Sequence, residues 1–171
     1  MKRAVGFLAA LVLTVGLVRP CWGVELTLTS HAALLMEKST GEILYAQNEH
    51  DALPPASVTK IMTVLLTMEA IDSGRIALDD MVTVSAYAAG MGGSQVFLAE
   101  GEQMSVDDLL KAVCVSSGND AAVALAEHVA GVTELFVEQM NNRARELGMK
   151  DTHFVNCTGL TAEGHVTSAH D

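Results

Sequence analysis

The sequence is poor in basic residues. Lysine and arginine together number 10, aspartate and glutamate number 21, and the formal net charge is −11. Nucleic acids and anionic lipid surfaces attract basic proteins, so this charge argues against both as binding partners. We therefore expect a protein that acts without nucleic acid and without a basic membrane-docking surface.

Metal-binding and phosphate-binding patterns are also missing. No Cys-x-x-Cys or His-x-x-x-His spacing occurs, and the six histidines are scattered along the chain. The glycine cluster at residues 90–93 does not lead into the Gly-Lys-Ser/Thr end of a phosphate-binding loop. We interpret it as a loop near a cleft, and we expect neither a metal nor a cofactor.

The apolar run at residues 4–18 is too short to favour a spanning helix. It follows the positive Met1-Lys2-Arg3 and precedes Cys21-Trp22-Gly23, which is a passable cleavage site. This pattern predicts a signal peptide at residues 1–23 and an exported, extracytoplasmic protein. An uncleaved membrane anchor is the alternative.

Two cysteines, Cys114 and Cys157, remain after residue 23. An exported protein could pair them in a disulfide. We favour two buried or partly buried thiols, because free cysteine behaves as a small hydrophobe. A cysteine nucleophile is the weakest of the three interpretations.

Ser57 and Lys60 form a Ser-x-x-Lys motif between a proline-containing loop at 51–56 and an apolar helical segment at 61–71. Residues three apart share a helix face, so the lysine can reach the serine hydroxyl. The positive end of the helix dipole and burial both lower the pKa of Lys60. A neutral amine can then take the serine proton, which is the Ser-Lys form of nucleophile activation. The alternative is a capping serine followed by a solvated lysine.

Ser117-Gly118-Asn119 forms a second polar cluster. A helix is predicted over residues 105–115, with Ser105 and Asp108 as a capping box, and another follows Asn119 at residues 121–130. The cluster therefore lies on a helix–helix turn, from which Ser117 and Asn119 can project into a cleft. The alternative is an ordinary Ser-Gly turn.

The remaining segments predict a small number of regular elements. Strands are expected at residues 32–36 and 42–46 with a turn at 38–41, a helix at 57–73, a short strand at 81–84 and an extended piece at 95–98. A helix is expected at 133–147, capped by Thr133. Its predicted core residues are Leu135, Phe136, Met140 and Leu147.

The two motifs and their flanks resemble those of low-molecular-mass penicillin-binding proteins, the serine-type D-alanyl-D-alanine carboxypeptidases. The resemblance implies an α/β (α+β) fold of the β-lactamase and DD-peptidase kind. A helical cluster would accompany the N-terminal hairpin of an antiparallel sheet. The resembling segments are residues 32–48, 55–63, 117–122 and 154–160.

The resemblance also implies roles for the motif residues. Ser57 would be the acylated nucleophile and Lys60 its base, and the Ser57 amide would supply one oxyanion-hole donor. Ser117 would relay a proton to the departing amine. Asn119 would bind the peptide amide of the substrate or help to hold Lys60. The implied partners are a peptidoglycan pentapeptide as substrate and β-lactams as inhibitors that acylate the same serine.

The third motif of the family, Lys-Thr-Gly, does not occur in these 171 residues. In the family its strand supplies part of the oxyanion hole and binds the substrate carboxylate. We therefore expect residues 24–171 to form an incomplete catalytic domain that is inactive or nearly so alone, with an unpaired hairpin edge. Residues 164–171 would begin a further helix capped by Thr167 or Ser168, and membrane association would need a C-terminal anchor outside this sequence.

Two other functions remain open. A class A-like β-lactamase shares both motifs, but it needs a glutamate about 35 to 40 residues after the second one. Residues 152–157 occupy that window and contain no glutamate, and Glu146 and Glu163 lack the expected flanks. A non-catalytic fragment that binds peptidoglycan is the second alternative.

Overall fold

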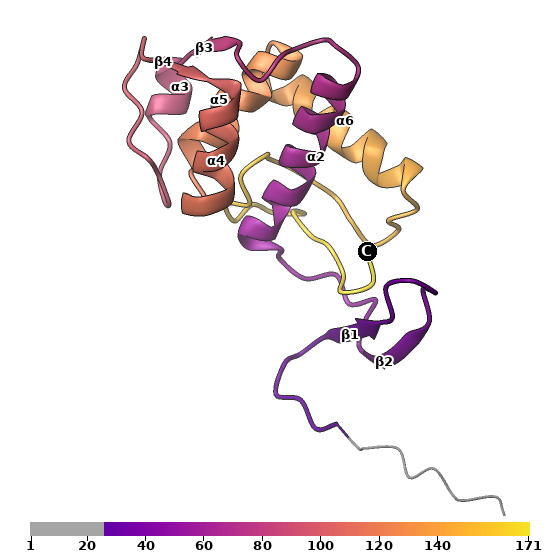
Figure 1. The fold of residues 1–171 in the computed structure, drawn as a ribbon. Coiled ribbons are helices and arrows are strands. Elements are labelled where there is room, and N and C mark those ends of the chain that lie inside the picture. Colours follow the sequence, from indigo (N-terminus) through magenta and orange to yellow (C-terminus); the bar gives the residue numbers. More distant parts are fainter. Residues whose placement is uncertain (1–25) are drawn as a thin grey trace, which may run out of the picture. The chain divides into compact units, whose positions relative to one another are not determined.

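The computed structural model describes residues 26–171, so the predicted signal peptide lies outside the described part. The chain divides into two units, Met1–Ser30 and His31–Asp171. The second unit contains every helix and strand described below (Figure 1). In chain order these are β1 (Ala33–Met36), β2 (Ile43–Gln47), the 3-10 turn η1 (Ala56–Thr59), α2 (Lys60–Asp72), β3 (Met81–Thr83), α3 (Ala86–Ala89), β4 (Gln103–Ser105), α4 (Val106–Ser116), α5 (Asn119–Ala130) and α6 (Thr133–Glu146).

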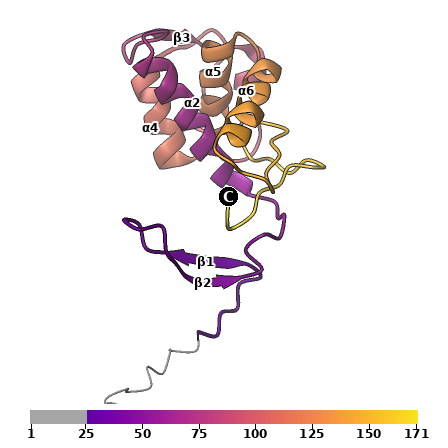
Figure 2. The same cartoon turned by 90° about the vertical axis from the view of Figure 1, so that its right-hand side faces the viewer.

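The hairpin predicted near the N-terminus is present. Strands β1 and β2 pair antiparallel, with an irregularity between Leu35 and Met36 (Figure 2). The turn is held by the Glu37 carboxylate, which accepts hydrogen bonds from the amides and hydroxyls of Thr40 and Ser39. These bonds, that of the Thr40 hydroxyl first, lower the pKa of Glu37 to about 2. Within residues 26–171, β1 and β2 form a two-stranded sheet to which no third strand is added.

Helix α5 lies at the centre of the helical cluster. It packs against α2, α3, α4 and α6, and its residues from Asn119 to Ala126 are all buried. A helix that is apolar around its whole circumference is expected to be buried in this way, and its alanines allow close approach of the neighbours. The side chains of Leu109, Leu125, Phe136 and Met140 fill the surrounding core.

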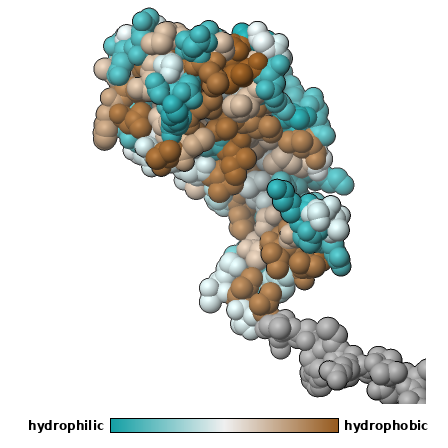
Figure 3. Space-filling model, in the orientation of Figure 1, coloured by the Kyte–Doolittle hydropathy of each residue, from teal (hydrophilic) through white to brown (hydrophobic). Residues whose placement is uncertain are grey.

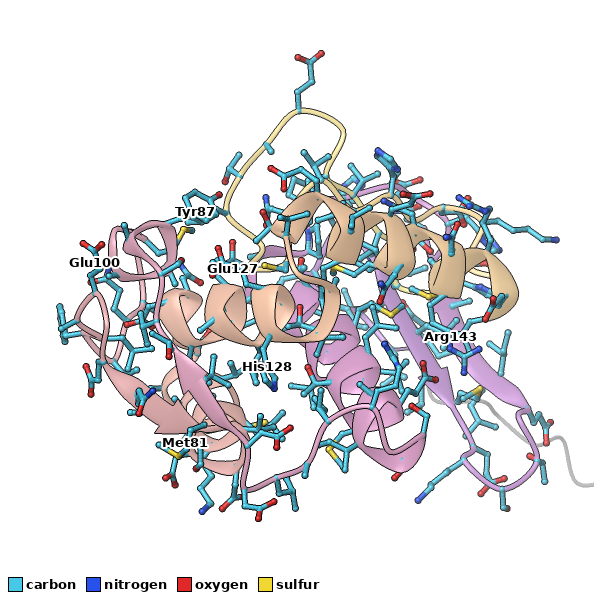
Figure 4. All side chains as sticks on the ribbon, turned by 90° about the horizontal axis from the view of Figure 1, so that it is seen from above. Met81, Tyr87, Glu100, Glu127, His128 and Arg143 are labelled. Atoms are coloured by element: carbon cyan, nitrogen blue, oxygen red, sulfur yellow. The ribbon has the colours of Figure 1, made fainter. Side chains whose placement is uncertain are left out.

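Helices α2 and α6 are also linked by charge. The Arg143 guanidinium, labelled in Figure 4, lies 2.8 Å from the Glu69 carboxylate. Figure 4 also shows Glu127 and His128 on opposite sides of α5 near its C-terminal end. His128 Nε2 is 3.6 Å from Asp80. The helices thus meet through a mainly apolar core with few ion pairs at its margin.

Two helix boundaries differ from the prediction. The α-helix begins at Lys60, and Ser57 lies on the preceding 3-10 turn, whose N-cap is Pro55; such turns are common at the N-termini of α-helices. Val132 is the N-cap of α6, and the Thr133 hydroxyl bonds to Glu134 instead, so the prediction of Thr133 as cap is wrong. The Ser105 cap of α4 is confirmed, since its hydroxyl accepts from the Asp108 amide.

The core prediction for α6 is half right. Phe136 and Met140 are fully buried, whereas Leu135 is 51% and Leu147 is 49% exposed. Only one face of α6 packs against α5 and α2, and these two leucines lie off that face. The surface therefore carries several exposed apolar side chains, seen as brown patches in Figure 3.

A short ribbon of β3 and β4 stands beside α4. The strand predicted at 81–84 is confirmed as β3, and it pairs antiparallel with β4, which the sequence did not predict. The extended piece predicted at residues 95–98 is not a strand. Phe97 has a φ of 61°, and the amides on either side of it bond to a side chain rather than to a neighbouring strand.

The last described segment, residues 150–171, runs as a loop joined to the rest of its unit by an isolated bridge. The bridge between Leu53 and Thr167 makes this connection, and the bridge between His153 and Val166 pairs the segment with itself. Thr167 takes part in the bridge to Leu53 and does not cap a helix. The Ser168 hydroxyl accepts from the Asp171 amide, which has the three-residue spacing of an N-cap. None of the described helices is long and apolar enough to span a membrane.

Candidate active site

Ser57 is positioned by a close backbone contact with Gly159. The preceding residue, Ala56, has a φ of 48°, and its carbonyl packs directly against Gly159. A Cβ on Gly159 would lie 1.8 Å from the Ala56 oxygen and 3.0 Å from the Ser57 nitrogen. Gly159 itself has a φ of 85°. Only glycine satisfies both the close approach and this backbone conformation.

Lys60 lies within hydrogen-bonding distance of Ser57. Its Nζ is 3.3 Å from Ser57 Oγ and donates to the Thr158 carbonyl at 2.7 Å. The lysine is only 5% exposed, and this burial lowers its pKa. A larger fraction of Lys60 than of a surface lysine is therefore in the neutral form that can act as a base.

The Thr158 carbonyl is held in place by a compact turn. The Asn156 side-chain oxygen accepts from the amides of Thr158 and Gly159. The Thr63 hydroxyl of α2 donates to the neighbouring Cys157 carbonyl at 2.7 Å. The turn thus presents two consecutive carbonyls to the same face of α2. Sequence reasoning identified residues 154–160 as a resembling loop but gave them no role.

The two cysteines are unpaired, in agreement with the favoured interpretation. Cys157 is 2% exposed, and its burial raises its pKa to about 12, so it is a neutral thiol. Cys114 is exposed, which contradicts the expectation of a buried or partly buried thiol. It lies on the face of α4 that borders a cavity, and the adjacent Val113 lines the same cavity although it is buried.

That cavity, of about 370 Å³, brings together Ser57, Lys60 and Ser117. Ser117 ends α4 in the left-handed conformation, with φ 56° and ψ 34°. Its hydroxyl oxygen is buried and has no hydrogen-bond partner in the described part of the chain. The nucleophile and base candidates and the second hydroxyl thus share one cavity, whose other lining residues are Ile61, Val64, Val113 and Cys114.

Asn119 does not line this cavity, and it makes no hydrogen bond to Lys60. Its backbone amide donates to the Ser94 carbonyl and its Nδ2 to the Gly92 carbonyl, both at 2.7 Å. Asn119 therefore fastens the glycine-containing loop to the start of α5. This contact places the loop beside the second motif, although residues 90–93 do not line the cavity, and among residues 26–171 no donor bonds to Asn119 Oδ1.

Asp120 helps to hold the loop beside the second motif, a role that was not predicted because Asn-Asp after Ser-Gly is typical of an ordinary helix start. The residue is 1% exposed. Its carboxylate accepts from the amides of Val96, Leu98 and Ala121. Phe97, between the first two, is thereby held at positive φ with 84% of its surface exposed. Asn119 of the second motif and the next residue, Asp120, therefore both bind the backbone of residues 92–98.

Replacement of Asp120 by asparagine is expected to lower the free energy of unfolding by about 2 kcal/mol, because an amide NH₂ would face backbone donors in a buried site. Urea unfolding measures the change. Asp107→Asn, an exposed substitution at the start of α4, is the control and should shift stability by about 0.5 kcal/mol. Equal effects of the two substitutions would contradict the role given to the Asp120 carboxylate.

Comparison with known proteins places these features in a family. A sequence profile described as D-alanyl-D-alanine carboxypeptidase matches residues 22–171. D-alanyl-D-alanine carboxypeptidase DacF of Bacillus subtilis is 53% identical over 147 residues, which are 86% of this chain and 38% of DacF. The chain thus spans less than two fifths of the length of this relative.

Solved structures show the same fold. The D-alanyl-D-alanine carboxypeptidase DacD from Francisella tularensis matches with a TM-score of 0.84 and 36% identity, covering 91% of this chain and 38% of that one. Penicillin binding protein 6B from Escherichia coli matches with a TM-score of 0.82 and 45% identity, covering 88% and 49%. The predicted α/β architecture with a helical cluster and an N-terminal hairpin is confirmed.

Proposed function

This chain belongs to the D-alanyl-D-alanine carboxypeptidase family, and we propose that it carries the nucleophile, the base and the proton relay of a serine-type carboxypeptidase. The substrate is the D-Ala-D-Ala end of a peptidoglycan stem pentapeptide. One observation carries the proposal: a buried lysine amine of lowered pKa lies 3.3 Å from the hydroxyl of a serine in a cavity.

Acylation begins with proton transfer from Ser57 Oγ to the neutral Lys60 amine. The oxygen then attacks the carbonyl of the penultimate D-alanine. The Ser57 amide has no acceptor among the described residues, so it is free to donate to the oxyanion that forms. A second donor comes from the Lys-Thr-Gly strand that the family resemblance implies.

Collapse of the tetrahedral intermediate breaks the peptide bond. The departing D-alanine nitrogen takes a proton, which the unpartnered Ser117 hydroxyl relays from the Lys60 ammonium. The resulting ester on Ser57 is hydrolysed by water. β-Lactams acylate the same serine, in keeping with the similarity to proteins named as penicillin-binding.

A class A-like β-lactamase is the weaker alternative. Such an enzyme needs a carboxylate that activates water next to the acyl-enzyme. Within residues 26–171 no carboxylate bonds to Ser57 or Lys60, and Glu146 bonds to Arg143. Slow release of a bound β-lactam would therefore distinguish the carboxypeptidase from a β-lactamase. We also propose that the protein acts outside the cytoplasm, where peptidoglycan is found.

A chimera tests the function. Residues 26–171 are joined to the part of Bacillus subtilis DacF that follows the matched region, and D-alanine release from a pentapeptide is measured. The chimera should release D-alanine, and its Ser57→Ala variant should lose at least about 10³-fold in rate. The 171-residue chain alone should be at least about 10²-fold slower than the chimera, because it lacks an oxyanion donor.

Three results would contradict the proposal. A folded chimera without D-alanine release would favour a non-catalytic peptidoglycan-binding protein. Rapid turnover of benzylpenicillin would favour the β-lactamase. Full activity of the 171-residue chain would show that the site needs no further motif.

A further inference from the structure

His165 is a buried imidazole whose two nitrogens both make hydrogen bonds. The residue is 3% exposed. Its Nε2 lies 2.7 Å from the Thr59 hydroxyl, and its Nδ1 accepts from the Val155 amide at 2.9 Å. The ring of Phe154 packs beside it at a centroid distance of 5.9 Å. The imidazole therefore connects the turn that carries Ser57 to the segment that leads to Thr158.

These contacts determine the tautomer of His165. A backbone amide is always a donor, so Nδ1 must be without a proton to accept from Val155. The proton of the neutral ring is then on Nε2, which donates to Thr59 Oγ1. In the imidazolium form, a proton on Nδ1 would face the Val155 N–H and the bond would be lost.

The contact to His165 is one of three from the same stretch of the chain. Thr59, Lys60 and Thr63 are buried, and each bonds to the segment between Val155 and His165. Lys60 and Thr63 bond to consecutive backbone carbonyls, and Thr59 bonds to the His165 side chain. His165 is thus the side-chain member of the interface that holds the Thr158 carbonyl against Lys60.

The surroundings of His165 favour its neutral form. Burial lowers its pKa, and His153 lowers it further. The elements that contact it also carry the Lys60 amine, the neutral Cys157 thiol and the exposed Glu163 carboxylate. In the described chain no carboxylate is hydrogen-bonded to the imidazole. Its stabilising effect is therefore complete above pH 6.5, the ordinary histidine pKa, and is lost as the pH falls through the lowered folded pKa.

We propose that His165 is a positioning residue that, as the neutral Nε2-protonated imidazole, clamps the Ser57–Lys60 turn to the segment supplying the Thr158 carbonyl, and that protonation opens this clamp. The functional meaning rests on the proposed carboxypeptidase activity. Opening the clamp lets water reach Lys60, so its amine becomes more basic and less of it is neutral. His165 would then set an acid limit for acylation of Ser57.

NMR on the 171-residue chain tests the clamp without a substrate. Imidazole ¹⁵N shifts report the tautomer of His165 and its titration, and the ¹³Cε shift of Lys60 reports the titration of its amine. Asparagine can keep the Val155 contact of Nδ1, and glutamine can keep the Thr59 contact of Nε2, so His165→Asn, His165→Gln and His165→Ala separate the two contacts. The exposed neighbour His153→Gln is the matched control.

The expected result is an Nε2–H tautomer that titrates below 6.5. In His165→Ala the Lys60 titration should rise by about one pH unit, a tenfold loss of neutral amine. His165→Gln and His165→Asn should each restore part of this shift, and His153→Gln should cause none. An Nδ1–H tautomer would overturn the proposal. So would a Lys60 titration that stays unchanged in His165→Ala while thermal stability falls, which is the result of a merely structural role.

Because these measurements need no turnover, they remain informative if the chimera proves inactive. Conversely, an active chimera whose His165 variants leave the Lys60 titration unchanged would overturn the clamp and leave the proposed function standing.

Discussion

Gly159→Ala is expected to lower the free energy of unfolding of this chain by about 4 kcal/mol and to abolish acylation of Ser57 in the chimera. The new Cβ would lie 1.8 Å from the Ala56 carbonyl oxygen, which is backbone and cannot rotate away. The alanine would also be forced to a φ of 85°. To relieve the overlap, the turn at Ala56 must move, and Ser57 moves with it. Urea unfolding and labelling with a fluorescent penicillin measure the two effects.

Gly164→Ala is the matched control for this substitution. Gly164 has a similar φ of 77°, but the nearest atom to its Cβ would be at an ordinary 3.9 Å. It should therefore show only the conformational penalty, about 1 to 2 kcal/mol, and acylation should be retained. If both variants lose the same stability, the contact between Gly159 and Ala56 does not position the nucleophile.

Lys60→Met is expected to reduce the acylation rate of the chimera by about 10³-fold, because methionine cannot take the Ser57 proton. The same substitution should reveal the lowered lysine pKa in the stability of the 171-residue chain. With a folded pKa below the unfolded 10.5, the unfolded state binds more protons between the two values. The stability of the unsubstituted chain relative to Lys60→Met should therefore rise with pH through the folded pKa and level off above 10.5.

Lys60→Arg is the control for this prediction. Arginine keeps its positive charge because it does not lose its proton in the accessible pH range. The Lys60→Arg variant should therefore be inactive, and its stability relative to Lys60→Met should not rise with pH. A stability difference between the unsubstituted chain and Lys60→Met that is independent of pH would show that burial does not lower the lysine pKa. Retained acylation in Lys60→Arg would show that this lysine is not the base.

The sequence was sufficient to select Ser57, Lys60 and Ser117, which the structure brings together in one cavity. The Ser-x-x-Lys spacing places Lys60 near Ser57 because local helical geometry does so, and Ser117 follows from a turn between two helices. The hairpin strands were predicted to within one residue because their composition and the turn between them act locally. These features depend on neighbours along the chain, which periodicity and turn residues describe well.

The parts that hold those residues in place were not predictable. Gly159 contacts Ala56, His165 contacts Thr59, and Asp120 binds the amides of Val96 and Leu98. Each contact joins segments that are distant in the sequence, so no local pattern indicates it. The exposure of Cys114 was missed for a related reason. Its apolar neighbours suggested the core, but its face of α4 borders the cavity beside Ser57.

The most direct test of the central claim is the intact mass of the chimera after incubation with benzylpenicillin, followed by peptide mapping. The account predicts one covalent adduct on the peptide that contains Ser57 and no adduct in the Ser57→Ala variant. Thermal unfolding of both proteins shows that they are folded. A folded chimera that gains no adduct, or one that carries it on another residue such as Cys114, would contradict the assignment of Ser57 as the nucleophile.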